Sequence, residues 1–257
     1  MDNRGPTRSR TAEKCHVAIL GVIGVPEADR FMSSATELRL RGDIPDVLLF
    51  LAHPETIALG ARGRFHEHPE DLLVPLSRLE QEGVALTRSV RGGGITYHWP
   101  GQIVCYPLLA LGPAERRVPA YMHNLEEVGI RALQSCGVDA DRRRDSAAHL
   151  GLWRDGCKVV SMGVRVSAWV TSFGFAVNLE GNHERSVYIR PCGLDGVRFT
   201  TVEHILGTAP PRSRVIEALK EHFSSVLGRE LEDAAPSLLE RIRSHALAAN
   251  YAMTGSG

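Results

Sequence analysis

A glycine-rich run with interspersed polar side chains is the densest chemical signal in this 257-residue chain. It reads RGGGITYHWPGQ and spans residues 91–102. Three successive glycines allow a backbone to approach a ligand closely, because glycine has no Cβ. Arg91, Tyr97, His98 and Gln102 add polar groups. The run is neither a dinucleotide-binding fingerprint nor a P-loop, since it lacks the required glycine spacing and the G-K-[ST] ending. The alternative is that residues 91–102 form a strained turn in which His98 is hydrogen-bonded within the protein and no ligand is bound.

Cys192 and Lys158 are the candidates for covalent chemistry. Pro191 and Gly193 flank Cys192, which indicates a bend that presents the thiol beside backbone N–H groups able to bind an oxyanion. A lysine ammonium near a thiol favours the thiolate, which is the nucleophile. A lone cysteine is more often an inert core residue, and a lysine at a strand edge is usually solvated. The two residues act together only if the fold brings them together.

The composition excludes several classes of protein. Thirty Lys and Arg residues balance thirty Asp and Glu residues, whereas a nucleic-acid-binding domain is normally basic. The hydrophobic fraction is 43% and the charged fraction 23%, as in ordinary globular domains. The five cysteines form no C-x-x-C pair, so the sequence suggests no zinc site or disulfide framework. A reducing compartment follows, and we expect a cytoplasmic location.

No apolar segment reaches the roughly 18 residues that a membrane span requires. Residues 1–14 are polar and contain no apolar core, so we expect a flexible N-terminus rather than a secretory signal. Residues 15–257 then form a single catalytic domain.

The helices and strands that position these residues are predicted from the periodicity of the apolar residues and from the Gly and Pro residues that end each segment. Pro107 predicts an edge position or the end of a strand for 102–109, while 158–166 and 170–179 indicate a hairpin. Residues 53–64 are interpreted as rich in turns. The pattern predicts one α+β domain with a mixed or antiparallel sheet. Strands are expected at 15–25, 46–52, 84–90, 102–109, 158–166 and 170–179, and helices at 28–42, 71–82, 119–136, 214–227 and 237–249.

Four motifs in order resemble the octanoyltransferase family of lipoate biosynthesis. The family pattern is R-G-G-x-x-T-Y-H-G-P-G-Q, then K-[IV]-[AC]-[SA]-[ILM]-G-[VI]-R-V, then H-G-[FL]-A-[LV]-N, then P-C-G. This chain has RGGGITYHWPGQ, KVVSMGVRV, FGFAVN and PCG at residues 91–102, 158–166, 173–178 and 191–193. The resemblance covers about residues 45–206. It implies the α+β core of biotin and lipoate ligases, and transfer of octanoyl from acyl carrier protein to a lipoyl-domain lysine.

The resemblance also implies a role for individual residues. Cys192 would carry the octanoyl group as a thioester, and Lys158 would lower the pKa of that thiol and move protons. An apolar tunnel would bind the chain with about 0.8 kcal/mol per buried methylene. No cofactor and no metal is expected, because the donor thioester is already activated. The residues implied to bind substrate are Arg91, Gly92, Gly93, Gly94, Ile95, Thr96, Tyr97, His98, Ser161, Met162, Gly163, Gly174, Phe175 and Ala176.

The implied partners are proteins. The donor is octanoyl-acyl carrier protein, and the acceptor is a lipoyl domain of a 2-oxoacid dehydrogenase or the glycine cleavage H protein. An acidic carrier calls for a local basic face, for which the candidates are Arg62, Arg64, Arg88 and 142–144. The alternative is that these arginines simply solvate the surface.

Two residues depart from the family pattern. Trp99 replaces a glycine and would narrow or cover the pocket. Phe173 replaces a histidine, which would remove a polar contact near the reacting groups. Two other functions stay open: an ATP-dependent lipoate ligase on the same fold, and a non-catalytic binder of acyl carrier protein or lipoyl domains.

Overall fold

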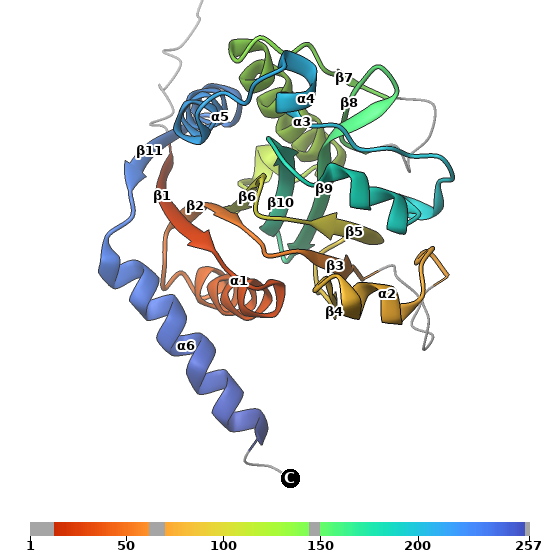
Figure 1. The fold of residues 1–257 in the computed structure, drawn as a ribbon. Coiled ribbons are helices and arrows are strands. Elements are labelled where there is room, and N and C mark those ends of the chain that lie inside the picture. Colours follow the sequence, from red (N-terminus) through yellow and green to blue (C-terminus); the bar gives the residue numbers. More distant parts are fainter. Residues whose placement is uncertain (1–12, 62–69, 144–149, 255–257) are drawn as a thin grey trace, which may run out of the picture.

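The chain folds around two β-sheets of unequal size (Figure 1). The computed structural model describes residues 13–61, 70–143 and 150–254. Within these ranges, β1 runs parallel to β2 and β11, and the other neighbouring strands of the larger sheet pair antiparallel. The order across that sheet is β11 (Arg229–Asp233), β1 (Glu13–Val22), β2 (Asp46–Ala52), β6 (Gln102–Leu108), β10 (Val170–Asn178), β9 (Cys157–Ser167), β8 (Leu152–Arg154) and β7 (Asp141–Arg142).

Two pairs of helices lie on the two faces of the larger sheet, and the second helix of the first pair packs against its partner helix and runs on past the sheet (Figure 1). The pairs are α1 (Val25–Leu40) with α6 (Pro236–Thr254), and α3 (Val118–Ser135) with α5 (Arg212–Leu227). α1 buries Ala28, Met32, Ala35 and Leu38, a spacing of three and four residues that keeps one helical face apolar. Every residue of β2, β6 and β10 is buried, so the central strands are held from both sides.

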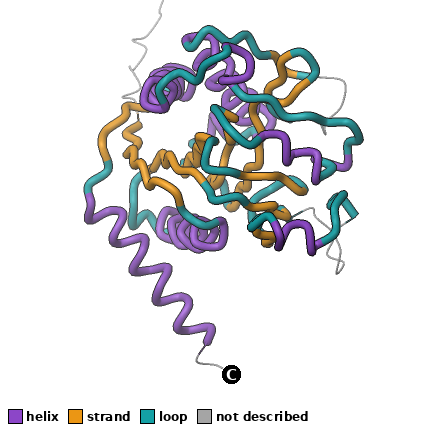
Figure 2. Tube along the Cα trace, in the orientation of Figure 1, coloured by secondary structure: helices purple, strands orange, loops and turns teal. Residues whose placement is uncertain are grey.

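The smaller sheet lies beside the larger one, next to a group of short helices and loops (Figure 2). β3 pairs parallel with β4 and antiparallel with β5. An apolar cluster that includes Ile57, Leu79, Tyr97 and Trp99 fills the space between this sheet and its cover. The bounds are β3 (Thr56–Leu59), β4 (Ala85–Arg88), β5 (Ile95–His98), α2 (Leu76–Gln81), η1 (Pro113–Glu115), η3 (His183–Tyr188), η4 (Pro191–Gly193) and α4 (Val202–Leu206).

The structure confirms the α+β class and most of the long elements. The strand at 46–52 has the predicted bounds, and the hairpin at 158–166 and 170–179 is β9 and β10, shifted by one residue at most of its ends. Pro107 is the penultimate residue of β6, but β6 is central rather than an edge strand. Of the two alternatives, the end of a strand is therefore confirmed and the edge position is wrong. A proline near a strand end gives up only one ladder hydrogen bond, so a central strand accommodates it there.

The sequence does not predict five short strands. β3 and β5 fall in segments that it indicates as turn and loop, and β7, β8 and β11 give no strand signal. Each has only two to five residues, too few to show a clear alternation. The predicted helix over 71–82 shortens to Leu76–Gln81, since Pro75 precedes its first turn. Of the predicted flexible terminus, residues 1–12 lie outside the described ranges, and β1 begins at Glu13.

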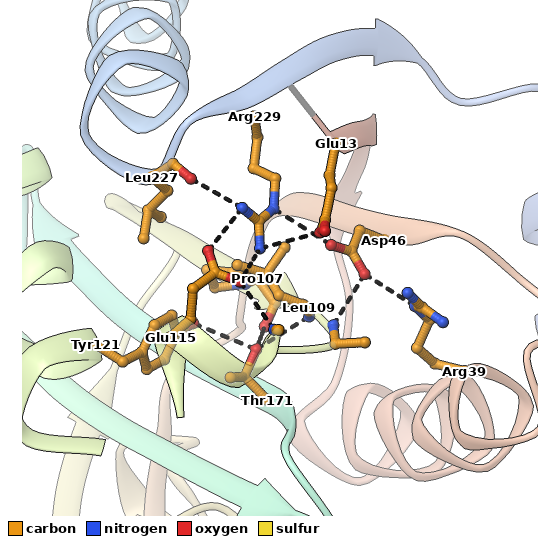
Figure 3. A network of polar contacts seen from close by, with 12 residues as sticks. Glu13, Arg39, Asp46, Pro107, Leu109, Glu115, Tyr121, Thr171, Leu227 and Arg229 are labelled. Atoms are coloured by element: carbon orange, nitrogen blue, oxygen red, sulfur yellow. Dashed lines mark hydrogen bonds and ion pairs between the residues drawn. The ribbon is translucent and has the colours of Figure 1, made fainter. Parts of the chain in front are cut away.

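A buried cluster of charges, centred on Arg229, joins the strands at one edge of the larger sheet (Figure 3). The Arg229 side chain is 3% exposed. It donates to both carboxylate oxygens of Glu115 at 2.9 and 3.1 Å, and its Nε lies 3.4 Å from Asp46 Oδ2. Asp46 also accepts from Arg39 Nε at 2.8 Å and from the Ala110 N–H at 2.9 Å. The cluster therefore links β11, β2 and α1 to the loops that follow β6.

Replacing Arg229 by alanine should destabilise the protein strongly. The substitution leaves the Asp46 carboxylate buried without one of its cations, and breaking a buried ion pair in this way costs about 3–5 kcal/mol. Urea unfolding followed by circular dichroism measures the change. The control is Arg241→Ala, since Arg241 and Asp43 are an exposed pair at 3.7 Å, and exposed pairs contribute little. Equal midpoints for both variants would contradict a stabilising role for the cluster.

Candidate active site

A cavity lies between the larger sheet and strand β5 of the smaller sheet. It contains about 530 Å³ of space, part of it open to solvent. β6, β9 and β10 form one wall, and β5 with the glycine loop before it forms another. The strand register places Val104, Ala176 and Ser161 side by side, and Gly174 beside Gly163. Small and apolar residues dominate the wall, which suits an aliphatic ligand.

Most residues implied by the motifs lie on this cavity wall. Gly92 and Tyr97 do not: Gly92 faces a neighbouring groove with Asp29 and Arg165, and Tyr97 packs into the apolar cluster behind β5. Consecutive strand residues point to opposite faces, so Tyr97 must face away when Thr96 and His98 face inward. The lining residues that were predicted are Lys158, Arg91, Gly93, Gly94, Ile95, Thr96, His98, Ser161, Met162, Gly163, Gly174, Phe175 and Ala176.

The glycine loop is shaped by backbone contacts as well as by the cavity. A Cβ on Gly92 would lie 2.1 Å from the Val164 carbonyl oxygen, and Gly93 has a φ of 89°, so both positions require glycine. The buried Arg91 guanidinium donates to the carbonyl oxygens of Ala58, Gly92 and Gly94 at 2.7–2.9 Å. Arg91 therefore ties the loop to β3 and brings a positive charge to the cavity.

Lys158 presents a second buried cation at the cavity. The residue is 3% exposed, and its Nζ lies 4.8 Å from the centre of the Trp153 indole ring, within cation–π range. Its N–H donates to Arg198 O at 2.8 Å, and its carbonyl accepts from the Thr200 N–H at 3.0 Å. The backbone N–H and C=O of Lys158 are therefore both hydrogen-bonded, which fixes the position of its Cα atom.

Cys192 belongs to the short turn η4, next to the cavity. Pro191 lines the cavity, and the backbone turns at Gly193 with a φ of 71°. The Cys192 side chain lies outside the described part of the chain. The N–H groups of Gly193 and Leu194 donate to the carbonyls of Arg190 and Pro191. These two amides are used within the turn, so they are poor candidates for an oxyanion site, contrary to the expectation from sequence.

A buried pair of polar groups, His53 and Tyr106, supports the cavity wall. His53 Nδ1 lies 2.7 Å from Ile23 O. A carbonyl only accepts, so Nδ1 carries the proton and Nε2 is an acceptor. The Tyr106 hydroxyl, 3.0 Å from Nε2, therefore donates to His53. This fixes the direction in which the Tyr106 ring enters the cavity.

A second polar chain links His98 to the backbone of Lys158. His98 Nδ1 donates to Gln102 Oε1 at 2.8 Å, since the Gln102 amide group itself donates to Asn178 Oδ1 at 2.9 Å. Asn178 Nδ2 in turn donates to Lys158 O and Thr200 O, each at 3.1 Å. His98 therefore keeps Nε2 as an acceptor at the cavity, and Lys158 is tied to β5 and β6.

Burial keeps both histidines neutral near pH 7. Burial lowers the pKa of His53 to about 4. The pKa of His98 falls well below its ordinary value, first because it is buried and then because of His53 and Arg91 nearby. These pKa shifts imply that low pH destabilises the fold. Between pH of about 6.5 and the folded pKa, the unfolded chain takes up protons that the native histidines exclude.

The free energy of unfolding should therefore fall as the pH drops from 6.5 towards 4. Each histidine contributes a slope of up to about 1.4 kcal/mol per pH unit. Urea unfolding of the wild type and of His53→Gln at pH 7.0, 6.0 and 5.0 (values chosen to bracket about 6.5) measures this slope. The variant should be less stable at pH 7 and should show a shallower decline. Parallel declines would contradict the assignment to His53.

The two departures from the family pattern lie away from the cavity wall. Trp99 stacks on Tyr97 at 5.3 Å and donates from its indole N–H to Glu180 O at 2.6 Å. It therefore neither narrows nor covers the cavity, contrary to expectation. Phe173 packs edge-on against Tyr106, with ring centres 5.3 Å apart. Phe173 contacts the Tyr106 ring and does not itself line the cavity.

Several residues of the site were missed from sequence. Val104, Tyr106 and Phe199 line the cavity, and His53 supports it. The alternation along β6 places Val104 and Tyr106 on one face, so they could be found once β6 is known to form the wall. His53 and Phe199 have no local signal, because only the fold brings them to the site.

The basic residues considered for partner docking have different environments. Arg142 is 16% exposed and pairs with Glu126 and Glu127, and Arg143 lies 4.9 Å from the centre of the Trp153 ring. Arg142 is therefore held inside the fold, which contradicts its place in an exposed docking run. Arg62, Arg64 and Arg144 lie outside the described residues. No group of three or more His, Cys, Asp or Glu side chains suited to a metal occurs in the described ranges, and none of their helices could span a membrane.

The fold and the sequence define the class. Over 91% of the chain, the structure superposes on lipoate-protein ligase A bound with ATP, with a TM-score of 0.70 and 14% identity, covering 94% of that protein. A bipartite lipoate protein ligase from Thermoplasma acidophilum gives a TM-score of 0.68 over 91% of the chain and 92% of that protein, at 15% identity. At these identities the likeness shows the fold, which is that of lipoate ligases.

The model of the lipoyl protein ligase A/B catalytic domain matches residues 28–224, and the chain belongs to this family. Within it, the similar curated proteins are octanoyltransferases. One from Caldicellulosiruptor saccharolyticus is 34% identical over 89% of this chain and 95% of its own length. Another, from a Roseiflexus species, is 38% identical over 82% and 86%. The protein is accordingly an octanoyltransferase, an acyltransferase, as the four motifs indicated.

Proposed function

We propose that the protein transfers an octanoyl group from acyl carrier protein to the ε-amine of a lipoyl-domain lysine through a thioester on Cys192. The observation that carries the proposal is the cavity: a mostly apolar wall with a buried ammonium, Lys158, and a turn that holds Cys192. An apolar wall binds the aliphatic chain, and a cation near a thiol favours the thiolate.

The first half of the reaction forms the acyl-enzyme. The Cys192 thiolate attacks the carbonyl carbon of the octanoyl thioester on the carrier's phosphopantetheine arm, forming a C–S bond and a tetrahedral oxyanion. The bond to the carrier sulfur then breaks, and Lys158 supplies the proton to the leaving thiolate.

The second half transfers the acyl group to the acceptor. The ε-amine of the acceptor lysine attacks the Cys192 thioester and gives up a proton to Lys158, now neutral. The C–S bond breaks, an amide remains on the acceptor, and Cys192 is released as a thiolate. Conversion of a thioester to an amide is downhill, so the scheme consumes no ATP.

The test supplies the donor and acceptor without nucleotide. We expect a lipoyl domain to gain one octanoyl group from octanoyl-acyl carrier protein, measured by intact-protein mass spectrometry. The matched reaction contains free octanoate and ATP in place of the carrier. Transfer in that second reaction alone would assign a ligase instead. Complexes with carrier or lipoyl domain but no transfer in either reaction would assign a binder.

A further inference from the structure

The cavity has two distinguishable ends, and Tyr106 lies at the end far from Lys158. Lys158 precedes Ser161 by three residues on β9, and Ser161 lies level with Val104 across the sheet. β6 and β9 run in the same direction, since each is antiparallel to β10. Tyr106 follows Val104 by two residues, so it emerges on the same face about 7 Å further from Lys158.

The Tyr106 side chain is fixed at both its hydroxyl and its ring. The hydroxyl donates to His53 Nε2 at 3.0 Å, and His53 is itself fixed by Ile23 O at 2.7 Å. The Phe173 ring meets the Tyr106 ring edge-on, at 5.3 Å between centres and 74° between planes. Tyr106 is 5% exposed. An incoming ligand therefore meets an aromatic surface that cannot turn aside without breaking both contacts.

Phe173 reaches this position through an unusual backbone conformation. Strict alternation along β10 would place it with Phe175 and Val177, which pack on the α3 side of the sheet. It lies instead in the cluster on the α1 side, with Tyr106 and Ala176. Its φ is 58°, in the left-handed region that a bulky residue rarely adopts. Such strain persists where the surroundings impose it, and it gathers at functional sites.

We propose that Tyr106, backed by Phe173 and His53, is the floor that sets the longest acyl chain the enzyme accepts. The proposal rests on the octanoyl transfer described above: the carbonyl carbon lies at the Lys158 end, and the terminal methyl group meets the Tyr106 ring. Each methylene that fits in the cavity raises affinity about fourfold. A further methylene that would have to displace the fixed Tyr106 ring does not raise the affinity. Tyr106 is thus a specificity-determining residue, while Phe173 and His53 are positioning residues.

The test compares chain-length limits in the wild type and in Tyr106→Val, which removes the ring and keeps a residue suited to a strand. Hexanoate, octanoate, decanoate, dodecanoate and tetradecanoate are added separately, and the rise in melting temperature reports binding. The variant should prefer dodecanoate over octanoate at least tenfold more than the wild type does. Tenfold corresponds to a little under two buried methylenes at about fourfold each. Tyr121→Leu is the control, because Tyr121 is buried on the opposite face and should leave the limit unchanged.

Two further variants keep the test decisive if Tyr106→Val does not fold. Phe173→Leu removes the support behind the ring and should shift the limit in the same direction by a smaller amount. Tyr106→Phe keeps the ring and its contact with Phe173 but loses the hydrogen bond to His53, so it should shift the limit less than Tyr106→Val does. A folded Tyr106→Val or Phe173→Leu variant with the wild-type chain-length limit would contradict the proposal that Tyr106 sets this limit.

The same acyl lengths, offered as carrier thioesters, separate this inference from the proposed function. Formation of the acyl-enzyme should follow the same limit as acid binding. A wild type that binds octanoate but is never acylated would contradict the transferase scheme, and the binding series would still decide whether Tyr106 limits chain length.

Discussion

Replacing Cys192 by alanine should abolish acyl transfer and the acyl-enzyme together. The substitution removes the sulfur atom that forms the thioester, so no acyl-enzyme can form and the proposed route to the acceptor amine is closed. Removal of a nucleophile typically lowers the rate by at least about 10³-fold. Intact-protein mass spectrometry should show one octanoyl adduct on the wild type, released by hydroxylamine, and none on the variant.

The control for this experiment is Cys157→Ala. Cys157 begins β9 directly before Lys158 and is a partly exposed free thiol, so it would be the rival site of acylation. The Cys157→Ala variant should keep both the octanoyl adduct and the wild-type turnover. Normal turnover by Cys192→Ala would refute the covalent scheme, and loss of the adduct in Cys157→Ala would move the nucleophile to that residue.

Replacing Lys158 by methionine should lower the rate by about 10²–10⁴-fold, the range of general acid–base catalysis. Methionine keeps an unbranched stem beside Trp153, so the packing changes little. Without a cation beside it, a thiol ionises with a pKa of about 8.5. The thiolate fraction of the variant then grows as the pH rises from 7 to about 8.5, so its deficit relative to the wild type should shrink with increasing pH.

Lys158→Arg separates charge from proton transfer. Arginine keeps the positive charge but does not release a proton at these pH values. A thiol has a pKa of about 8.5, so the carrier can leave as a thiolate without that proton, whereas the attacking amine must lose one. Acyl-enzyme formation should therefore suffer less than transfer to the amine, when the two half-reactions are timed separately by quenched mass measurements. A loss that is equal in both half-reactions and constant with pH would instead indicate that Lys158 acts only through the structure of the site.

The sequence could predict the long elements and the identity of the motifs. Each of α1, α3, α5, β2, β9 and β10 has enough residues for its periodicity to show. The short strands β3 and β5 could not be recognised, because four residues carry too little pattern. β5 depends on its pairing with β3 and on the apolar cluster that buries Ile95 and Tyr97. The direction of β1 was likewise hidden: pairing with β2 and β11 depends on where α1 and α5 return the chain.

For the site, the residue types and order along the chain determined which groups could react: a thiol between Pro191 and Gly193, a lysine opening an apolar strand, and a glycine loop with Arg91. The tertiary structure alone decided which of them share a cavity. It directed the Tyr97 and Trp99 side chains into a separate apolar cluster and packed Phe173 against Tyr106. It also brought His53, which follows β2, to the site. A motif shows which residue types the reaction and the local backbone conformation require. The direction of a buried side chain is set instead by strand register and by the packing of distant segments.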